Sequence, residues 1–193
     1  MKTINKRMAL LIAALIITVT SFGQTKWTTD KNHAQLHFSV MHFGITHIEG
    51  TFKTFEVGIK SEKKDFTNAK IEMTADVKSI NTQVEMRDDD LKSNNWFNAE
   101  KFPALVFKSK SFLKVKGNNY KLSGNITMHG ITKPISFNVV FNGWAVTMSK
   151  KQTAGFTITG KIKRRDFNIG DTPIKSGVGD VIEVWANVEI GKN

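Results

Sequence analysis

The sequence predicts an all-β protein whose strands form a sandwich or a closed barrel. Apolar and polar residues alternate in many short windows, and almost no long helix is expected between them. Successive side chains of a strand point to opposite faces, so each window is expected to be a strand with one apolar and one solvated face. Without helices to cover them, the apolar faces must pack against one another. The clearest windows are 34–40, 69–77, 122–128, 135–141, 156–162 and 182–190.

The windows amount to roughly eight to ten strands, and their short connections favour an up-and-down order. Trp27 opens a short first strand, and residues 33–42 form the second. The apolar phase switches near residues 53–54, which predicts a bulge or a corner where the sheet turns. Residues 117–119 (Gly-Asn-Asn) and 142–143 (Asn-Gly) are turn signals between strands.

One segment, residues 82–103, interrupts this alternation. Thr82 and Glu85 match a capping-box pattern, and residues 83–91 predict a short helix. Three aromatic residues and a proline follow it: Trp96, Phe97, Phe102 and Pro103. A polar helix followed by aromatic side chains predicts either a lid over one end of a barrel or a crossover packed against that end.

The first 23 residues have the pattern of a secretory signal peptide. Residues 2–7 carry three positive charges, residues 8–19 are apolar, and small residues stand at 21 and 23. An apolar run of this length is short for a membrane span, which favours a cleaved signal peptide. The alternative is an uncleaved N-terminal anchor. The pattern predicts a periplasmic or secreted protein with one mature domain, residues 24–193. No cysteine is present, which excludes disulfides and a bacterial lipoprotein.

The mature chain is basic. The precursor has a net charge of +11, and removal of the three leader charges leaves +8. Lysines are scattered over the polar phases of the predicted strands, which favours a solvated surface that keeps strand edges from aggregating. A weak attraction to lipid headgroups is the alternative. No aromatic-studded basic motif is visible, so we expect no binding of nucleic acid.

No catalytic or metal-binding signature is present. His33 and His37 share one strand face but lie about 13 Å apart, too far for both to hold one ion. Residues 88–90 are consecutive aspartates, which fan around a helix axis and do not converge. We therefore expect no enzyme activity, no metal site and no required cofactor. The competing hypothesis is an enzyme that uses groups near a barrel mouth: Asp88, Asp90 or His129.

The apolar faces combine rings with small side chains. The chain has 14 phenylalanines, and small residues stand among them on the inward phases. This mixture leaves room for a slot lined by rings, and it also fits the taper of a barrel that side chains fill completely. The small inward residues are Ala34, Ala69, Ala75, Gly124, Gly160 and Ala186.

Four segments form an ordered set of motifs over most of the mature chain. They are residues 38–44 (FSVMHFG), residues 87–103 with RD, L, WF and KFP, residues 124–134 (GNITMHGITKP), and residues 165–170 (RDFNIG) followed by 179–181 (GDV). Together they resemble the YceI-like family of exported lipid-binding proteins. Three positions depart from the family pattern: Asp90 replaces a histidine, Trp96 a phenylalanine and Asn168 a glycine.

The resemblance implies an extended, lipocalin-like antiparallel β-barrel of about eight strands with a short inserted helix. It also implies a carrier or sequestering protein whose lumen holds a long polyprenyl chain or isoprenoid quinone. A ligand-free structural stress protein with a filled barrel is a further alternative. The expected partner is the hydrophobic lipid, while transient contact with a membrane surface and a homodimer stay open.

The phase of the strands, together with the aromatic segment, assigns the side chains that are expected to face the ligand. They are Leu36, Phe38, Val40, Phe43, Ile71, Met73, Trp96, Phe97, Phe102, Phe107, Ile126, Met128, Phe137, Val139, Phe156, Ile158 and Val184.

Overall fold

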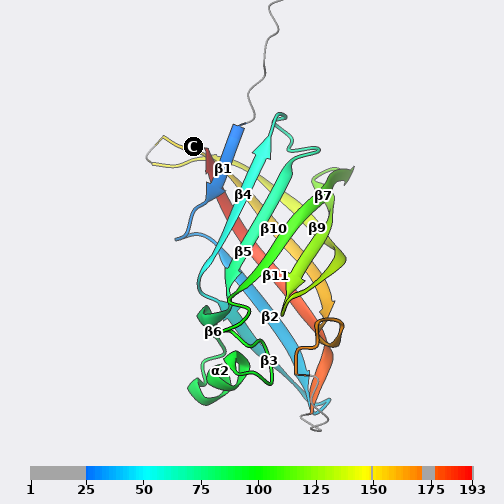
Figure 1. Ribbon diagram of the computed structural model, residues 1–193. Helices are drawn as coiled ribbons and strands as arrows, with labels where there is room; N and C mark the ends of the chain where they lie inside the picture. Colours follow the sequence, from blue (N-terminus) through cyan, green and yellow to red (C-terminus); the bar gives the residue numbers. More distant parts are fainter. Residues whose placement is uncertain (1–24, 149, 171–176, 193) are drawn as a thin grey trace, which may run out of the picture.

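A computed structural model describes residues 25–148, 150–170 and 177–192, which form one continuous antiparallel sheet rolled into a barrel (Figure 1). The strands are β1 (Thr25–Thr29), β2 (Gln35–His42), β3 (Thr46–Phe52), β4 (Phe55–Ser61), β5 (Lys70–Asp76), β6 (Ile80–Asn81), β7 (Ala104–Lys116), β8 (Asn119–Met128), β9 (Ile131–Val146), β10 (Gln152–Lys163) and β11 (Val178–Lys192). Three short helices accompany them: η1 (Val77–Ser79), α2 (Glu85–Lys92) and η2 (Arg164–Phe167).

The barrel closes because β1 pairs with both of its neighbours. The strands follow the order β1-β4-β5-β7-β8-β9-β10-β11, and the additional pairing of β1 with β11 completes a ring of eight. Beyond this ring, β2 pairs with the remaining length of β11, β3 pairs with β2, and β6 pairs with β3. The predicted all-β fold, with its antiparallel barrel of about eight strands and its short inserted helix, is therefore confirmed.

Two of the predicted irregularities have different outcomes. The phase switch at residues 53–54 is the corner between β3 and β4, as predicted. The turn predicted at Asn142-Gly143 is wrong, because both residues lie within β9. Phe141 pairs with Phe156 and Gly143 pairs with Gly155, which leaves Asn142 as the extra residue of a β-bulge. The backbone of Gly143 has a φ of 123°, which explains why the bulge uses glycine there.

Aromatic side chains close one end of the barrel. Phe66, in the loop between β4 and β5, is 1% exposed. The centre of its ring lies 5.2 to 6.0 Å from the centres of four other aromatic rings. The loop is held in place by Tyr120, whose hydroxyl donates to the Asp65 carbonyl at 2.8 Å. We call this cluster the aromatic seal, and this end the seal end; its members are Trp27, Phe66, Phe141, Trp144 and Phe156.

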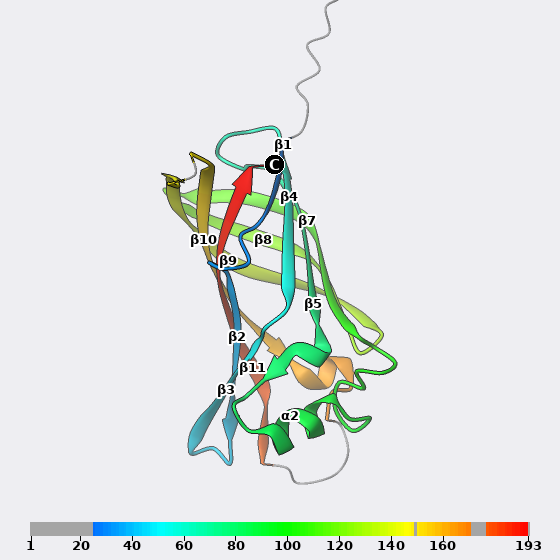
Figure 2. The ribbon, with the colours of Figure 1, turned by 90° about the vertical axis from the view of Figure 1, so that its left-hand side faces the viewer.

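The opposite end, here called the helix end, carries α2, η2 and the turn between β2 and β3 (Figures 1 and 2). The helix predicted at residues 83–91 is present as α2, but the capping box is wrong. Val84 is the N-cap residue and makes no side-chain cap bond. Thr82 instead donates its backbone N–H and its hydroxyl to the buried Asp88 carboxylate. Hydrogen bonds to a buried charged acceptor are stronger than a solvated cap, so Thr82 turns toward Asp88.

The predicted signal peptide, residues 1–23, lies outside the described residues. Within the described part of the chain, no helix is long and apolar enough to cross a membrane.

Truncation of the seal should destabilise the fold. Phe66→Ala removes a fully buried ring, so the free energy of unfolding should fall by about 3–5 kcal/mol in urea denaturation. Phe43→Ala is the matched control, because Phe43 also has a positive φ but is 64% exposed. Its unfolding free energy should stay within about 0.5 kcal/mol of the original. Equal losses in the two variants would show that the backbone conformation, and not the seal, sets the effect.

Candidate ligand cavity

The inside of the barrel contains a cavity of about 440 Å³. This volume is in the range of known pockets for small molecules and cofactors. Fifteen of the seventeen side chains predicted to face a ligand line it, contributed by β2, β5, β7, β8, β9, β10, β11 and the segment after α2. These are Leu36, Phe38, Val40, Ile71, Met73, Trp96, Phe97, Phe107, Ile126, Met128, Phe137, Val139, Phe156, Ile158 and Val184.

Two predicted ligand-facing residues do not line the cavity. Phe43 lies in the turn after β2, where it is 64% exposed and its ring contacts that of His42. The phase rule does not extend into a turn, which explains why Phe43 lies outside the cavity. Phe102 packs its ring 4.8 Å from that of His129 and covers Gly130, outside the lumen. Phe102 follows a helix and not a strand, so alternation gave no information about its direction.

Glycines in the wall let phenylalanine rings approach it closely. A Cβ atom on Gly160 would sit 2.4 Å from the ring of Phe137, and one on Gly50 would sit 2.3 Å from the ring of Phe38. The rings therefore occupy the space that the glycines leave, beside the wall and not across the lumen. This arrangement explains how a barrel rich in phenylalanine keeps an open interior, where the mixture of large and small residues had allowed a filled one.

Charged side chains reach the cavity only at the helix end. Among the described residues that line it, Arg87, Asp90 and Arg164 are charged, and all three belong to α2 or η2. The lining toward the seal end is apolar, with Ile59, Phe112, Phe156 and Val188 among its members. The cavity thus has a polar rim at the helix end and an apolar bottom at the aromatic seal.

The two arginines of the rim are held by the backbone. Arg164 is 4% exposed and donates to the carbonyls of Ile169, Gly170, Val178 and Gly179 at 2.7 to 3.0 Å. Arg87 donates to the hydroxyl and the carbonyl of Thr82, both at 2.8 Å.

Sequence reasoning missed Arg164. The family motif at residues 165–170 begins with Arg165, the next residue along the chain, which is exposed. A usable signal was present, because Arg164 continues the inward phase of Phe156, Ile158 and Ile162 along β10.

Trp96 and Phe97 form the wall of the cavity beside this rim. The ring of Trp96 lies 5.5 Å from the Arg164 guanidinium and so close to Gly170 that a Cβ there would be 2.5 Å away. Phe97 packs edge-on against Phe52 of β3, with ring centroids 6.2 Å apart. The segment after α2 therefore bridges β3 on one side and the η2 turn on the other. This placement fits both alternatives that the sequence left open, a lid over this end of the barrel and a crossover packed against it.

The groups of the competing enzyme hypothesis do not converge. The Asp88 carboxylate is buried against Thr82, and Asp90 lines the cavity. His129 lies in the turn between β8 and β9, where its Nδ1 is 3.0 Å from the Phe167 carbonyl. Asp89 points elsewhere again and pairs with Lys92. The aspartates fan around α2 as predicted.

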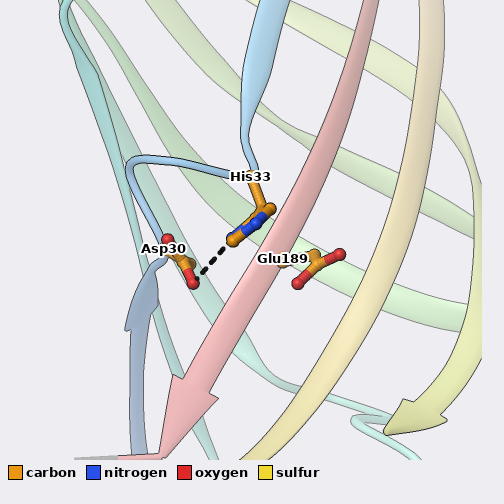
Figure 3. A group of neighbouring side chains, drawn as sticks. All are labelled: Asp30, His33 and Glu189. Carbon is orange, nitrogen blue, oxygen red and sulfur yellow. Dashed lines mark hydrogen bonds and ion pairs between the residues drawn. The ribbon is translucent and has the colours of Figure 1, made fainter. Parts of the chain in front are cut away.

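A second cluster of polar side chains lies on the outer surface, where the chain passes from β1 to β2 (Figure 3). Asp30, His33 and Glu189 bring ligand-type atoms within 4.8 Å of one another. His33 Nδ1 lies 3.1 Å from the Asp30 carboxylate, and the Asp30 N–H donates to the Glu189 carbonyl at 2.8 Å. These contacts fasten the β1–β2 turn to β11. His37 does not join the cluster, and its ring stacks on Trp185 instead.

Comparison with known proteins identifies related sequences over most of the chain. The family model of the YceI-like domain matches residues 27–190. Protein YceI of Salmonella arizonae and that of Salmonella heidelberg are each 33% identical to this chain over 160 residues, which are 82% of this chain and 83% of the relative.

Solved structures share the fold. BcnA of Burkholderia cenocepacia superimposes with a TM-score of 0.74 at 23% identity, covering 83% of this chain and 98% of that one. The YCEI protein of Campylobacter jejuni has a TM-score of 0.71 at 28% identity, covering 77% and 87%. A polyisoprenoid binding domain from Saccharophagus degradans, implicated in plant cell wall breakdown, has a TM-score of 0.63 at 14% identity, covering 86% and 98%.

The surface cluster should shift the titration of His33. The hydrogen bond to Asp30 raises the pKa of His33, with a smaller contribution from the charge of Glu189, and the bond to His33 lowers the pKa of Asp30. The stabilisation from His33 is therefore complete below its unfolded pKa of about 6.5 and is lost as pH rises through the higher folded pKa. The stabilisation from Asp30 is present above its unfolded pKa and is lost as pH falls through its lowered folded pKa.

NMR titration of the imidazole checks this. Asp30→Asn should bring the pKa of His33 back toward about 6.5, and the control Glu189→Gln should lower it less. A pKa of His33 that is the same in all three proteins would contradict the interaction.

Proposed function

This chain belongs to the YceI-like family, and we propose that its barrel binds a single long isoprenoid lipid and carries or sequesters it outside the cytoplasm. The observation that carries the proposal is the cavity itself, an apolar sleeve closed by aromatic rings at one end and rimmed by charged groups at the other. That polarity matches an amphiphile with one apolar tail and one polar head.

The lining and the tail have matching chemistry. Removal of each methylene-sized group from water is worth about 0.8 kcal/mol, so a polyprenyl tail gains greatly from an apolar sleeve. A bilayer offers the same tail nearly the same shelter. Transfer between membrane and barrel is therefore close to thermoneutral, which suits a reversible carrier, while water gives the bound lipid no route of escape.

The polar rim is the proposed place of the headgroup. Arg87 and Asp90 present opposite charges there, while Arg164 is largely occupied by backbone carbonyls. A polyprenyl chain and an isoprenoid quinone both meet this description, since each joins a branched apolar tail to a polar head. The leader pattern of residues 1–23 supports a carrier that acts in the periplasm or outside the cell.

Binding accounts for the interior better than the two alternatives. A ligand-free structural protein with a filled barrel does not explain a cavity of about 440 Å³. An enzyme needs acid, base or nucleophilic groups that lie close together. Asp88 instead accepts a hydrogen bond from Thr82, and the His129 ring contacts the Phe167 carbonyl. The family and the polyisoprenoid binding neighbour likewise favour a binding protein.

Lipid retention should depend on the inner face of the wall. Phe137→Glu places a charge in the lumen and should abolish retention, which mass spectrometry of an organic extract of the purified protein would measure. Lys121→Glu is the matched control, because Lys121 lies on the outer face and its Nζ donates to Asn138, the residue next to Phe137. Loss of lipid from both variants, or no lipid in the original protein made in an isoprenoid-rich host, would contradict the proposal.

Loosening the segment after α2 should speed lipid exchange. Trp96→Ala combined with Phe97→Ala removes the two rings that wall the helix end, so transfer of a fluorescent polyprenyl lipid to vesicles should be at least about tenfold faster. Phe102→Ala is the control, since Phe102 belongs to the same segment but lies outside the lumen. An unchanged rate in the double variant, with lipid still bound, would place the entrance elsewhere.

A further inference from the structure

The fold gathers lysines at the seal end. Nine exposed lysines lie on the strand ends and loops there, and we call them the lysine cluster: Lys26, Lys60, Lys63, Lys64, Lys114, Lys116, Lys150, Lys151 and Lys192. The same segments contain two acidic residues, Glu62 and Asp65, so the local net charge is +7. The predicted mature chain has +8 in all, which means that nearly its whole excess of positive charge sits at one end.

Contacts within the chain make this end continuous. Lys26 and Lys60 are cross-strand partners on β1 and β4. The Tyr120 hydroxyl ties the β4–β5 loop to β8, and the Lys114 ammonium lies 5.9 Å from the centre of the Tyr120 ring. The rings of Trp27 and Trp144, 5.3 Å apart, join β1 to β9. The lysine cluster and the aromatic seal therefore lie at the same end of the barrel.

Few acidic side chains accompany these lysines. Lysine ion pairs between described residues involve Lys31, Lys78, Lys92 and Lys161, none of which belongs to the lysine cluster. Asp65, one of the two local acids, accepts hydrogen bonds from Thr67, and the charges of Lys114 and Lys63 contribute to the lowering of its pKa. Nine lysines against two acids leave an excess of positive charge for an anionic partner.

Protection of strand edges explains only part of the cluster. Lysines commonly prevent edge-to-edge pairing, and Lys114 and Lys116 lie on β7 beyond its pairing with β5, which ends at Glu72 and Lys108. Lys60, however, lies where β4 pairs with both β1 and β5, so it protects no open edge.

Apolar side chains project from the same hairpins. Leu113 and Val115 alternate with Lys114 and Lys116 before the β7–β8 turn and are 50% and 69% exposed. Val146 and Met148, beside the β9–β10 turn, are 72% and 105% exposed. Exposed aliphatic side chains interleaved with lysines are the composition of segments that lie in the headgroup region of an anionic bilayer.

We propose that the seal end is a docking surface for an anionic lipid bilayer. Lysines of the cluster contact the lipid phosphates, and the two hairpins insert Val115 and Met148 among the headgroups. The helix end fits such a surface poorly. Residues 82–103 carry five acidic and three basic side chains, and the exposed β2–β3 turn, with Phe43 and Ile45, has no lysine or arginine within residues 41–50.

Docking in this orientation has a consequence for the lumen. The aromatic seal faces the bilayer, and the rim with Arg87 and Asp90 faces away from it. The docked protein therefore stays at its membrane while the mouth is open to a second acceptor. Membrane docking and lipid loading are independent properties, so a failure of one leaves the other to be judged separately.

Vesicle flotation tests the proposal. The purified protein should float with phosphatidylcholine vesicles that contain about one third phosphatidylglycerol, not with phosphatidylcholine alone, and roughly 0.5 M salt should release it. The variant Lys114→Glu with Lys116→Glu should bind the anionic vesicles at least about tenfold more weakly, because each lysine near such a surface contributes a severalfold gain. Its lipid content, from mass spectrometry, should be unchanged.

The control makes the same change of charge elsewhere. Lys133→Glu with Lys163→Glu alters two exposed lysines of β9 and β10 outside the cluster and should retain most of the binding. An equal loss in the control, or equal flotation with both kinds of vesicle, would overturn the proposal. So would loss of binding in Phe43→Ser with Ile45→Ser, which would place docking at the helix end. Retention on heparin without vesicle binding would assign the cluster to a soluble polyanion and also overturn it.

Discussion

The short strand β1 holds the barrel closed, and the other features depend on this closure. Three of its residues pair with β11 and four with β4, so each of these two strands gains a partner on the side where the sheet would otherwise stay open. The same strand carries Trp27, which is buried and packs on Phe66 and Trp144. The same short strand therefore both closes the sheet and helps to close one end of the barrel. Without it, the apolar lining would lie on an open, aggregation-prone sheet.

The interior is kept open by pairing rings with glycines. Phe38 lies over Gly50, and Phe137 lies over Gly160, each too close to tolerate a Cβ atom on the glycine. Atoms of both rings occupy the space beside the backbone that a larger residue would fill, and both rings line the cavity. An empty apolar cavity leaves such surfaces without dispersion partners, and an apolar ligand supplies them. An apolar ligand would therefore fill the cavity with favourable dispersion contacts to these rings.

The two ends of the molecule have opposite character. The helix end has charged groups at the rim of the cavity, and the segment around α2 carries an excess of acidic residues. The seal end is apolar inside and strongly basic outside. This asymmetry gives the barrel two chemically different ends, so a charged partner interacts differently with each of them.

The sequence by itself determined the face that each strand residue takes, since alternation along a strand is local: Phe38, Phe137 and Ile158 line the cavity as their phase requires. Only the tertiary structure decided where alternation stops. It turned Asn142-Gly143 into a bulge, placed Phe43 and Phe102 outside the lumen, and directed Thr82 to Asp88. It also gathered lysines that are scattered along the chain, because hairpins bring distant segments to one end, and local periodicity carries no information about that.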